Sequence, residues 1–160
     1  MILTIDSDLP TFKAVYFHHG LNVLLSDKSP DSGDKQTRNS AGKTSLIEII
    51  HFLLGGDAGK DSLPKNPTLI NFSFFGTFQL GDNKVTIRRT GSEPTRIWLN
   101  SDTAERLGIE VQKDKDSGDT YISNAIWKEL LGYKMFGLPS HVKGSSFEEA
   151  YSPSFRGLFP

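Results

Sequence analysis

The sequence predicts an α/β fold with a mixed β-sheet, and features in three regions lead to this prediction. The apolar run LNVLL (21–25) is typical of a strand that is buried on both faces of a sheet. The stretch TSLIEIIHFLL (44–54) has the spacing of a helix with a single polar stripe, so most of it should be buried. Between residues 72 and 100, apolar and polar residues alternate in runs that turn-forming residues separate. We therefore expect a strand–loop–helix unit followed by an antiparallel meander.

The composition is that of a single globular domain. The chain has 160 residues, a net charge of −1 and no cysteine. These values exclude a disulfide framework and a thiolate metal site, and they provide no bulk attraction to DNA or to a membrane surface. The longest near-continuous apolar run, LIEIIHFLL, is too short to span a bilayer, and the N-terminus lacks the pattern of a signal peptide. We expect a cytoplasmic protein.

The single domain, 1–160, is expected to have three parts. The first part, 1–56, holds the strand–loop–helix unit, and Gly55-Gly56 end its helix. Short strands are expected ahead of LNVLL at ILTI (2–5) and FKAVYF (12–17). The second part, 57–113, holds the meander, whose strands are FSFFGTFQL (72–80), KVTIRR (84–89) and TRIWLN (95–100).

The third part, 114–160, is expected to be a helical segment. It begins with the polar loop DKDSGD (114–119), which lacks both the full spacing and the closing glutamate of a calcium-binding loop. A helix should follow, with Gly132 just past its end, because apolar residues recur at helical spacing: Ile122, Ile126, Trp127, Leu130 and Leu131. Both Trp98 and Trp127 lie on apolar faces, so we expect them in the core.

The segment S-A-G-K-T-S (40–45) is a candidate phosphate-binding loop at the start of the first helix. Backbone N–H groups at a helix N-terminus favour anions, and Gly42 allows a phosphate to approach the backbone closely. Lys43 would reach the β- and γ-phosphates, the Thr44 hydroxyl would bind Mg²⁺, and Ser45 could reach the α-phosphate. The alternative is a Gly-Lys turn that caps an ordinary buried helix. The predicted strand and helix on either side favour the phosphate site.

The motif departs from the usual G-x-x-x-x-G-K-[ST] pattern at its first glycine, because Thr37 occupies that position. The stretch T-R-N-S-A-G-K-T nevertheless resembles G-x-N-G-[AS]-G-K-[ST], the Walker A form of the SMC, RecN and RecF ATPases of the ABC class. The identical positions are Asn39, Ala41, Gly42, Lys43 and Thr44. The resemblance covers residues 1–100. Within the class, W-K-E-L-L-G (127–132) and S-F-R (154–156) resemble bacterial SMC-like ATPases of the DUF2326 type.

This resemblance implies the N-terminal lobe of a split P-loop ATPase head that binds ATP and Mg²⁺. It implies a cofactor-binding set in which Lys43 is catalytic and Thr44 binds the metal: Arg38, Asn39, Ser40, Ala41, Gly42, Lys43, Thr44 and Ser45. The signature motif L-S-G-G and an apolar run ending in Asp-Glu are absent from this sequence. We therefore expect the natural chain to continue past Pro160 into a coiled coil and a C-terminal lobe that carries them.

Hydrolysis would then need that lobe and a second head, and this chain alone should hydrolyse ATP very poorly. The resemblance implies a role in DNA repair, DNA maintenance or phage defence, with a homodimer of heads and DNA as a possible partner. The alternative from a different class is a P-loop interaction module that binds without hydrolysis. The missing carboxylates and Thr37 keep this alternative open.

Four basic residues outside the motif have two interpretations each. Lys60 and Lys65 lie in GGDAGKDSLPKN, where they could contact DNA or belong to a solvated loop. Arg88 and Arg89 are neighbours on a predicted strand, so their side chains should point to opposite faces of the sheet. We expect one to face solvent and the other to pair with a carboxylate or a phosphate.

Overall fold

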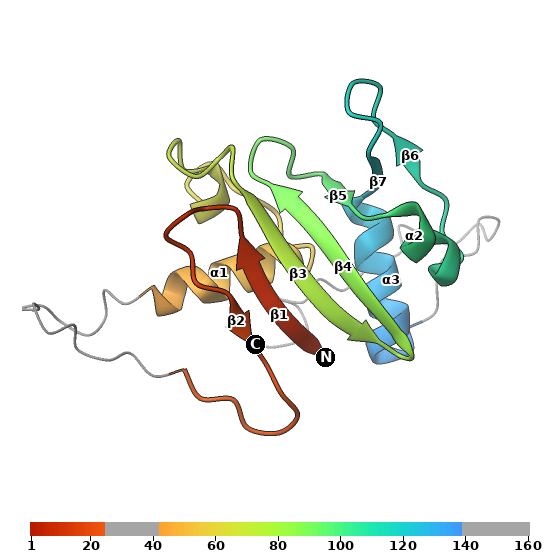
Figure 1. Ribbon diagram of the computed structural model, residues 1–160, viewed down its shortest axis with the longest axis horizontal. Coiled ribbons are helices and arrows are strands. Elements are labelled where there is room, and N and C mark those ends of the chain that lie inside the picture. The colour runs from red at the N-terminus through yellow and green to blue at the C-terminus, as the bar shows by residue number, and fades with distance from the viewer. Residues whose placement is uncertain (25–41, 139–160) are drawn as a thin grey trace, which may run out of the picture.

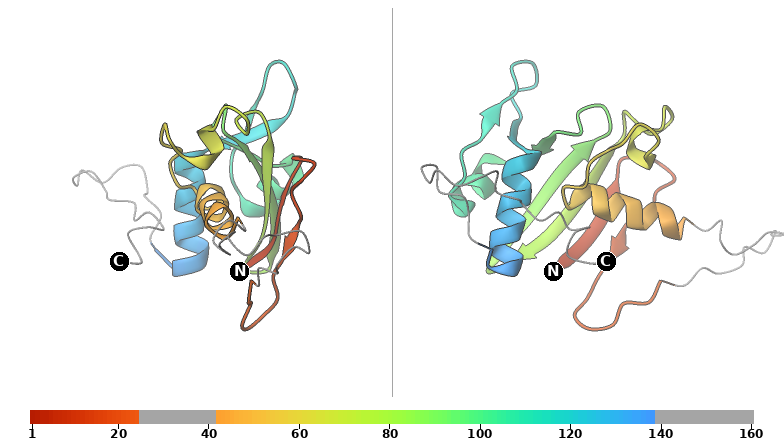
Figure 2. Two further views of the ribbon diagram at one scale, coloured as in Figure 1. Left: turned by 90° about the vertical axis from the view of Figure 1, so that its left-hand side faces the viewer. Right: turned by 180° about the vertical axis from the view of Figure 1, so that it is seen from behind.

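A seven-stranded sheet in the order β2-β1-β3-β4-β5-β7-β6 is the centre of the computed structural model, which describes residues 1–24 and 42–138. Its strands are β1 (Ile2–Ser7), β2 (Val15–Tyr16), β3 (Ser73–Leu80), β4 (Asn83–Thr90), β5 (Arg96–Trp98), β6 (Gln112–Lys113) and β7 (Thr120–Ser123). The helices are α1 (Lys43–Leu53), η2 (Leu63–Lys65), α2 (Ser101–Leu107) and α3 (Asn124–Phe136). Helices α1 and α3 cover the same face of the sheet (Figures 1 and 2). No helix in the described ranges is long and apolar enough to cross a bilayer.

The mixed sheet that we expected is wrong for the described residues, because every strand pairing there is antiparallel. The described part of LNVLL, residues 21–24, forms no strand, and the Leu21 and Val23 side chains are 82% and 66% exposed. The Asn22 side chain instead accepts from the His18 N–H at 3.0 Å and donates to the His18 carbonyl at 2.8 Å. These bonds close a local turn, which competes with strand pairing. Leu25 lies outside the described residues.

The antiparallel meander is confirmed. Strands β3 and β4 pair without interruption from Ser73↔Thr90 to Leu80↔Asn83, and β5 follows beside β4. Their alternation sends one set of apolar side chains into the core beneath α1 and α3, namely Phe74, Phe78, Leu80, Val85, Ile87 and Ile97. Trp98 and Trp127 are also buried, as predicted.

The helix predicted over 44–54 is confirmed as α1, but its burial is less complete than expected. Ile49, Phe52 and Leu53 are buried against the sheet. Ile47, on the opposite side of the helix, is 54% exposed. The helix is less buried than expected because the sheet contacts only one side of it.

The other helices depart from the sequence prediction at their ends. Helix α3 runs through Gly132 to Phe136 and ends at Gly137, which has a φ of 65°. Gly132 is therefore an interior residue, and the left-handed glycine at Gly137 is the actual terminator. Helix α2 was not predicted. It begins where the Asn100 side chain accepts from the Thr103 N–H at 2.8 Å, which is an ordinary N-cap.

Close packing between two turns fixes the top of the meander. A Cβ on Gly91 would lie 1.6 Å from the carbonyl oxygen of Pro64. The N–H of the next residue, Ser92, donates to the Ile70 carbonyl at 2.9 Å. The backbone of the β4–β5 turn thus lies directly on the segment 63–72, and only glycine fits at position 91.

We predict that Gly91→Ala lowers the free energy of unfolding by about 3 kcal/mol or more, because the added methyl forces two backbone segments apart. Gly59→Ala is the matched control, since nothing lies within 4 Å of a Cβ at that position. It should change the free energy of unfolding by less than about 0.5 kcal/mol. Urea unfolding followed by circular dichroism measures both, and equal midpoints for the two variants would contradict the packing argument.

Candidate functional site

The N-terminus of α1 carries the described half of the predicted phosphate loop. Gly42 adopts a φ of 72° and is the N-cap, and its carbonyl accepts from the Leu46 N–H at 2.9 Å. Lys43 and Ser45 are half-buried, whereas Gly42 and Thr44 are exposed. No acidic residue lies in the first turn of the helix. The N–H groups of this turn, which have no partner within α1, favour an anion together with the helix dipole and the Lys43 amine.

The other predicted loop residues, Arg38, Asn39, Ser40 and Ala41, lie outside the described residues, as does Thr37. The structure therefore brings together Gly42, Lys43, Thr44 and Ser45. Among the described residues, nothing lies within 4 Å of a Cβ position at Gly42. Glycine is therefore favoured here by the backbone conformation, because most other residues would be strained at this positive φ.

The C-terminus of α1 is held by side chains from two other elements. Arg89 of β4 donates through Nη1 to the carbonyls of Phe52 and Gly56, the latter at 3.0 Å. From α3, Trp127 Nε1 donates to the Leu53 carbonyl at 2.8 Å and Asn124 Nδ2 donates to the Gly55 carbonyl at 3.0 Å. These bonds satisfy carbonyls that a helix end leaves without internal partners.

Arg89 is the centre of this arrangement. Its side chain is only 1% exposed, its guanidinium lies 4.0 Å from the Phe52 ring centroid, and it also donates to the Pro94 carbonyl. Burial lowers the pKa of Arg89 to about 10, and the negative charge of Asp57 partly offsets this shift. Arg88 points to the other face and pairs with Asp119 at 2.9 Å. The opposite orientation is confirmed, but the inward arginine bonds to carbonyls rather than to a carboxylate or phosphate.

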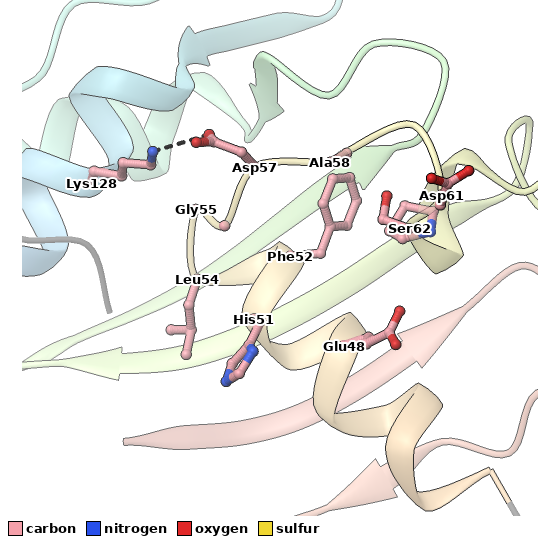
Figure 3. Close-up of a pocket in the computed structure, with 12 residues that line it drawn as sticks. Glu48, His51, Phe52, Leu54, Gly55, Asp57, Ala58, Asp61, Ser62 and Lys128 are labelled. Carbon is pink, nitrogen blue, oxygen red and sulfur yellow. Dashed lines mark hydrogen bonds and ion pairs between the residues drawn. The ribbon is translucent and has the colours of Figure 1, made fainter. Parts of the chain in front are cut away.

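A pocket of about 310 Å³ lies beside this C-terminal end of α1 (Figure 3). Its polar rim includes Glu48, which accepts from the Leu63 N–H at 3.2 Å, and Asp57, which pairs with Lys128 at 3.1 Å. The described residues of the predicted phosphate loop, Gly42, Lys43, Thr44 and Ser45, do not line it. Gly42, Lys43, Thr44 and Ser45 lie at the start of α1, whereas the pocket lies towards its C-terminal end.

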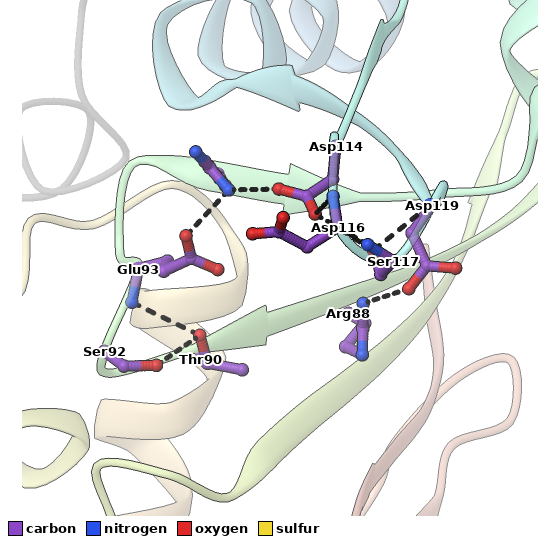
Figure 4. A network of polar contacts seen from close by, with 9 residues as sticks. Arg88, Thr90, Ser92, Glu93, Asp114, Asp116, Ser117 and Asp119 are labelled. Atoms are coloured by element: carbon purple, nitrogen blue, oxygen red, sulfur yellow. Dashed lines mark hydrogen bonds and ion pairs between the residues drawn. The ribbon is translucent and has the colours of Figure 1, made fainter.

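A second polar network orders the loop between β6 and β7 (Figure 4). The Asp114 carboxylate accepts from the N–H groups of Asp116 and Ser117, both at 3.0 Å, and from Arg96 Nη1 at 2.9 Å. The bonds from Ser117 and Asp116 lower the pKa of Asp114 below its ordinary value of 3.8. The carboxylate is thus used in a turn, and the described residues contain no cluster of metal-ligating side chains.

We predict that the turn around Asp114 is ordered above its ordinary pKa of 3.8 and is lost as pH falls through the lowered folded-state value. The Ser117 amide resonance should follow this titration in NMR spectra recorded between about pH 5 and about pH 2. Asp114→Asn removes the titrating charge and should abolish the transition. A midpoint above 3.8 in the natural chain would contradict the assignment of these hydrogen bonds.

We predict that Arg89→Met lowers the free energy of unfolding by about 3 kcal/mol or more, because it leaves buried carbonyls without donors. Arg88→Met is the matched control on the neighbouring position, and the loss of its partly exposed ion pair should cost about 1 kcal/mol or less. Chemical denaturation of both variants measures the difference. Similar losses for the two would show that Arg89 does not hold the end of α1.

Comparison with known proteins finds partial similarity to one group. The chain is 32% identical over 93 residues to the DNA replication and repair protein RecF of Shewanella sp. (strain MR-4), which covers 54% of this chain and 26% of that protein. RecF of Symbiobacterium thermophilum is 30% identical over 95 residues, covering 59% of this chain and 21% of that protein. The chain thus spans about a quarter of the curated relatives it matches.

No protein-family model matches the chain, and no solved structure matches it. The partial similarity to RecF supports the wider resemblance to the SMC, RecN and RecF class. The narrower resemblance to the DUF2326 type stays a prediction.

Proposed function

We propose that this chain is the ATP-binding N-lobe of an SMC-like ATPase that acts in DNA repair, DNA maintenance or phage defence. The observation that carries the proposal is the position of G-K-T-S: Gly42 caps α1, and Lys43, Thr44 and Ser45 form its first turn. A motif of this composition in an arbitrary loop would have no such geometry. The similarity to RecF, whose name describes a DNA replication and repair protein, supports the same proposal.

The described residues at the start of α1 support a site for a nucleoside triphosphate with Mg²⁺. The first turn of α1 holds no acidic side chain, and among the described residues nothing lies within 4 Å of a Cβ position at Gly42. Lys43 would pair with the β- and γ-phosphates, the exposed Thr44 hydroxyl would bind the metal, and Ser45 would reach the α-phosphate. The bound Mg²⁺ would neutralise charge on the phosphates. Arg38, Asn39, Ser40 and Ala41 would complete the loop.

Exposed apolar side chains on both sides of the loop support a partner lobe. Leu21, Val23 and Leu24 before it are 82%, 66% and 49% exposed, and Ile47 after it is 54% exposed. Leaving large apolar side chains in water forgoes the free energy that burial provides. We propose that a C-terminal lobe covers residues 21–24 and pairs with them as a strand. That lobe and a second head would supply the groups that position the attacking water.

The alternative, a P-loop module that binds without hydrolysis, uses the same site at the start of α1. ATP hydrolysis, rather than ATP binding, distinguishes the ATPase head from the binding module. Hydrolysis that appears when this chain is joined to a C-terminal lobe supports the ATPase head. Binding without turnover in every longer form supports the module.

DNA contact is proposed through the segment that follows α1. Lys60 is exposed, and Lys65 is half-buried in η2. Binding through only these two lysines should be weak and should fall as salt is added. Lys60→Ala should weaken it equally for all DNA sequences.

We predict that Lys43→Ala weakens binding of ATP with Mg²⁺ by about tenfold or more, because a charge-assisted contact to the phosphates is lost. Calorimetric titration of the folded chain measures the affinity. Lys84→Ala is the matched control, since Lys84 is an exposed lysine on β4. It should bind ATP as the natural chain does.

Thr44→Val tests the metal role separately. It should leave metal-free nucleotide binding nearly unchanged and remove most of the gain in affinity that Mg²⁺ provides. Equal affinities for the natural chain and Lys43→Ala would remove Lys43 from the site, whatever the result for Thr44.

A further inference from the structure

Helix α3 has an exposed apolar face on the side turned away from the sheet. Ile126, Tyr133 and Phe136 are 38%, 52% and 42% exposed, although Trp127, on the opposite side, is fully buried. The three exposed side chains stand seven and then three positions apart, a spacing that aligns them on one side of a helix. The views in Figure 2 show α3 as an outer layer over the sheet.

The end of the described chain turns back onto this face. Gly137 takes a left-handed φ of 65°, and the Leu138 N–H then donates to the Gly132 carbonyl at 3.2 Å. The Leu138 side chain comes within 3.5 Å of the Cβ position of Gly132. Gly132 is four positions before Phe136, so it belongs to the same side of α3. Because glycine has no side chain, the Leu138 side chain can pack against α3 at Gly132.

The sequence after Leu138 is rich enough in apolar residues to cover more of the exposed face of α3. Residues 139–160 contain several large apolar residues, namely Val142, Phe147, Tyr151, Phe155, Leu158 and Phe159. Phe147, Tyr151 and Phe155 are spaced by four. Helix α3 has 13 residues and is therefore about 20 Å long. A chain of this length, starting at Leu138, reaches the far end of α3 with residues to spare.

We propose that residues 139–160 of this chain dock onto the exposed face of α3 within the same molecule. Phe147, Tyr151 and Phe155 supply the apolar contacts to Ile126, Tyr133 and Phe136. The occupant is the chain's own following segment, and a second copy of the chain is the competing occupant that the experiment must separate.

The absence of cysteine makes single-thiol labelling a direct test. Tyr133→Cys is placed in the full chain, and its labelling rate is compared with and without the additional changes Phe147→Ser and Phe155→Ser. We expect labelling to become at least about fivefold faster when the two aromatics are removed, because the thiol loses its cover. Thr86→Cys, on an exposed position of β4, is the control and should label at the same rate in both backgrounds. Equal rates at position 133 overturn the proposal.

A disulfide cross-link keeps the test independent of those substitutions. In the otherwise natural chain, Tyr133→Cys with Tyr151→Cys should form a disulfide within one molecule under mild oxidation, seen as a monomer by non-reducing electrophoresis and as a linked peptide pair by mass spectrometry. Linked dimers without the intramolecular pair would assign the face to a second copy. Protection of the Tyr133→Cys thiol that grows with protein concentration would do the same, and either result overturns docking within the molecule.

Discussion

The buried guanidinium of Arg89 is the interaction on which the arrangement of α1 depends. A charged group with 1% exposure is stable only where its donors find acceptors, and here carbonyls from α1, the loop after it and the β4–β5 turn provide them. A planar group with five donors can reach all three segments at once, which a lysine could not do. The hydrogen bonds that compensate for the burial of Arg89 also satisfy carbonyls at the end of α1. Removing these bonds would leave both the guanidinium and the carbonyls without partners.

The two ends of α1 differ in how they are held in the structure. The C-terminal end is fixed to β4 by Arg89 and to α3 by Trp127 and Asn124. The N-terminal end carries Gly42 and Lys43, and its N–H groups have no acidic side chain of the first turn nearby. A helix that is anchored at one end holds the other in a defined position. The position of the proposed nucleotide site therefore depends on core contacts at the other end of α1, which Arg89, Trp127 and Asn124 provide.

Much of this could be predicted from local pattern. The alternation in 72–90 specified β3 and β4, and the helical spacing of 44–54 specified α1, because each signal reports which side of an element is buried. The run at 21–24 could not be placed in the same way, since an apolar segment does not encode which neighbour will cover it. The bond from Asn22 back to His18 is a local competitor that hydrophobicity does not reveal. Arg89 shows a third limit: its strand position was predictable, but its carbonyl partners come from distant segments.

Both edges of the sheet end in very short strands, β2 with Val15–Tyr16 and β6 with Gln112–Lys113. An edge of two residues offers few unpaired backbone groups to another chain, so it is a poor template for continuing the sheet across a molecular boundary. Among the described residues, these two edges are therefore poor sites for strand pairing with another molecule.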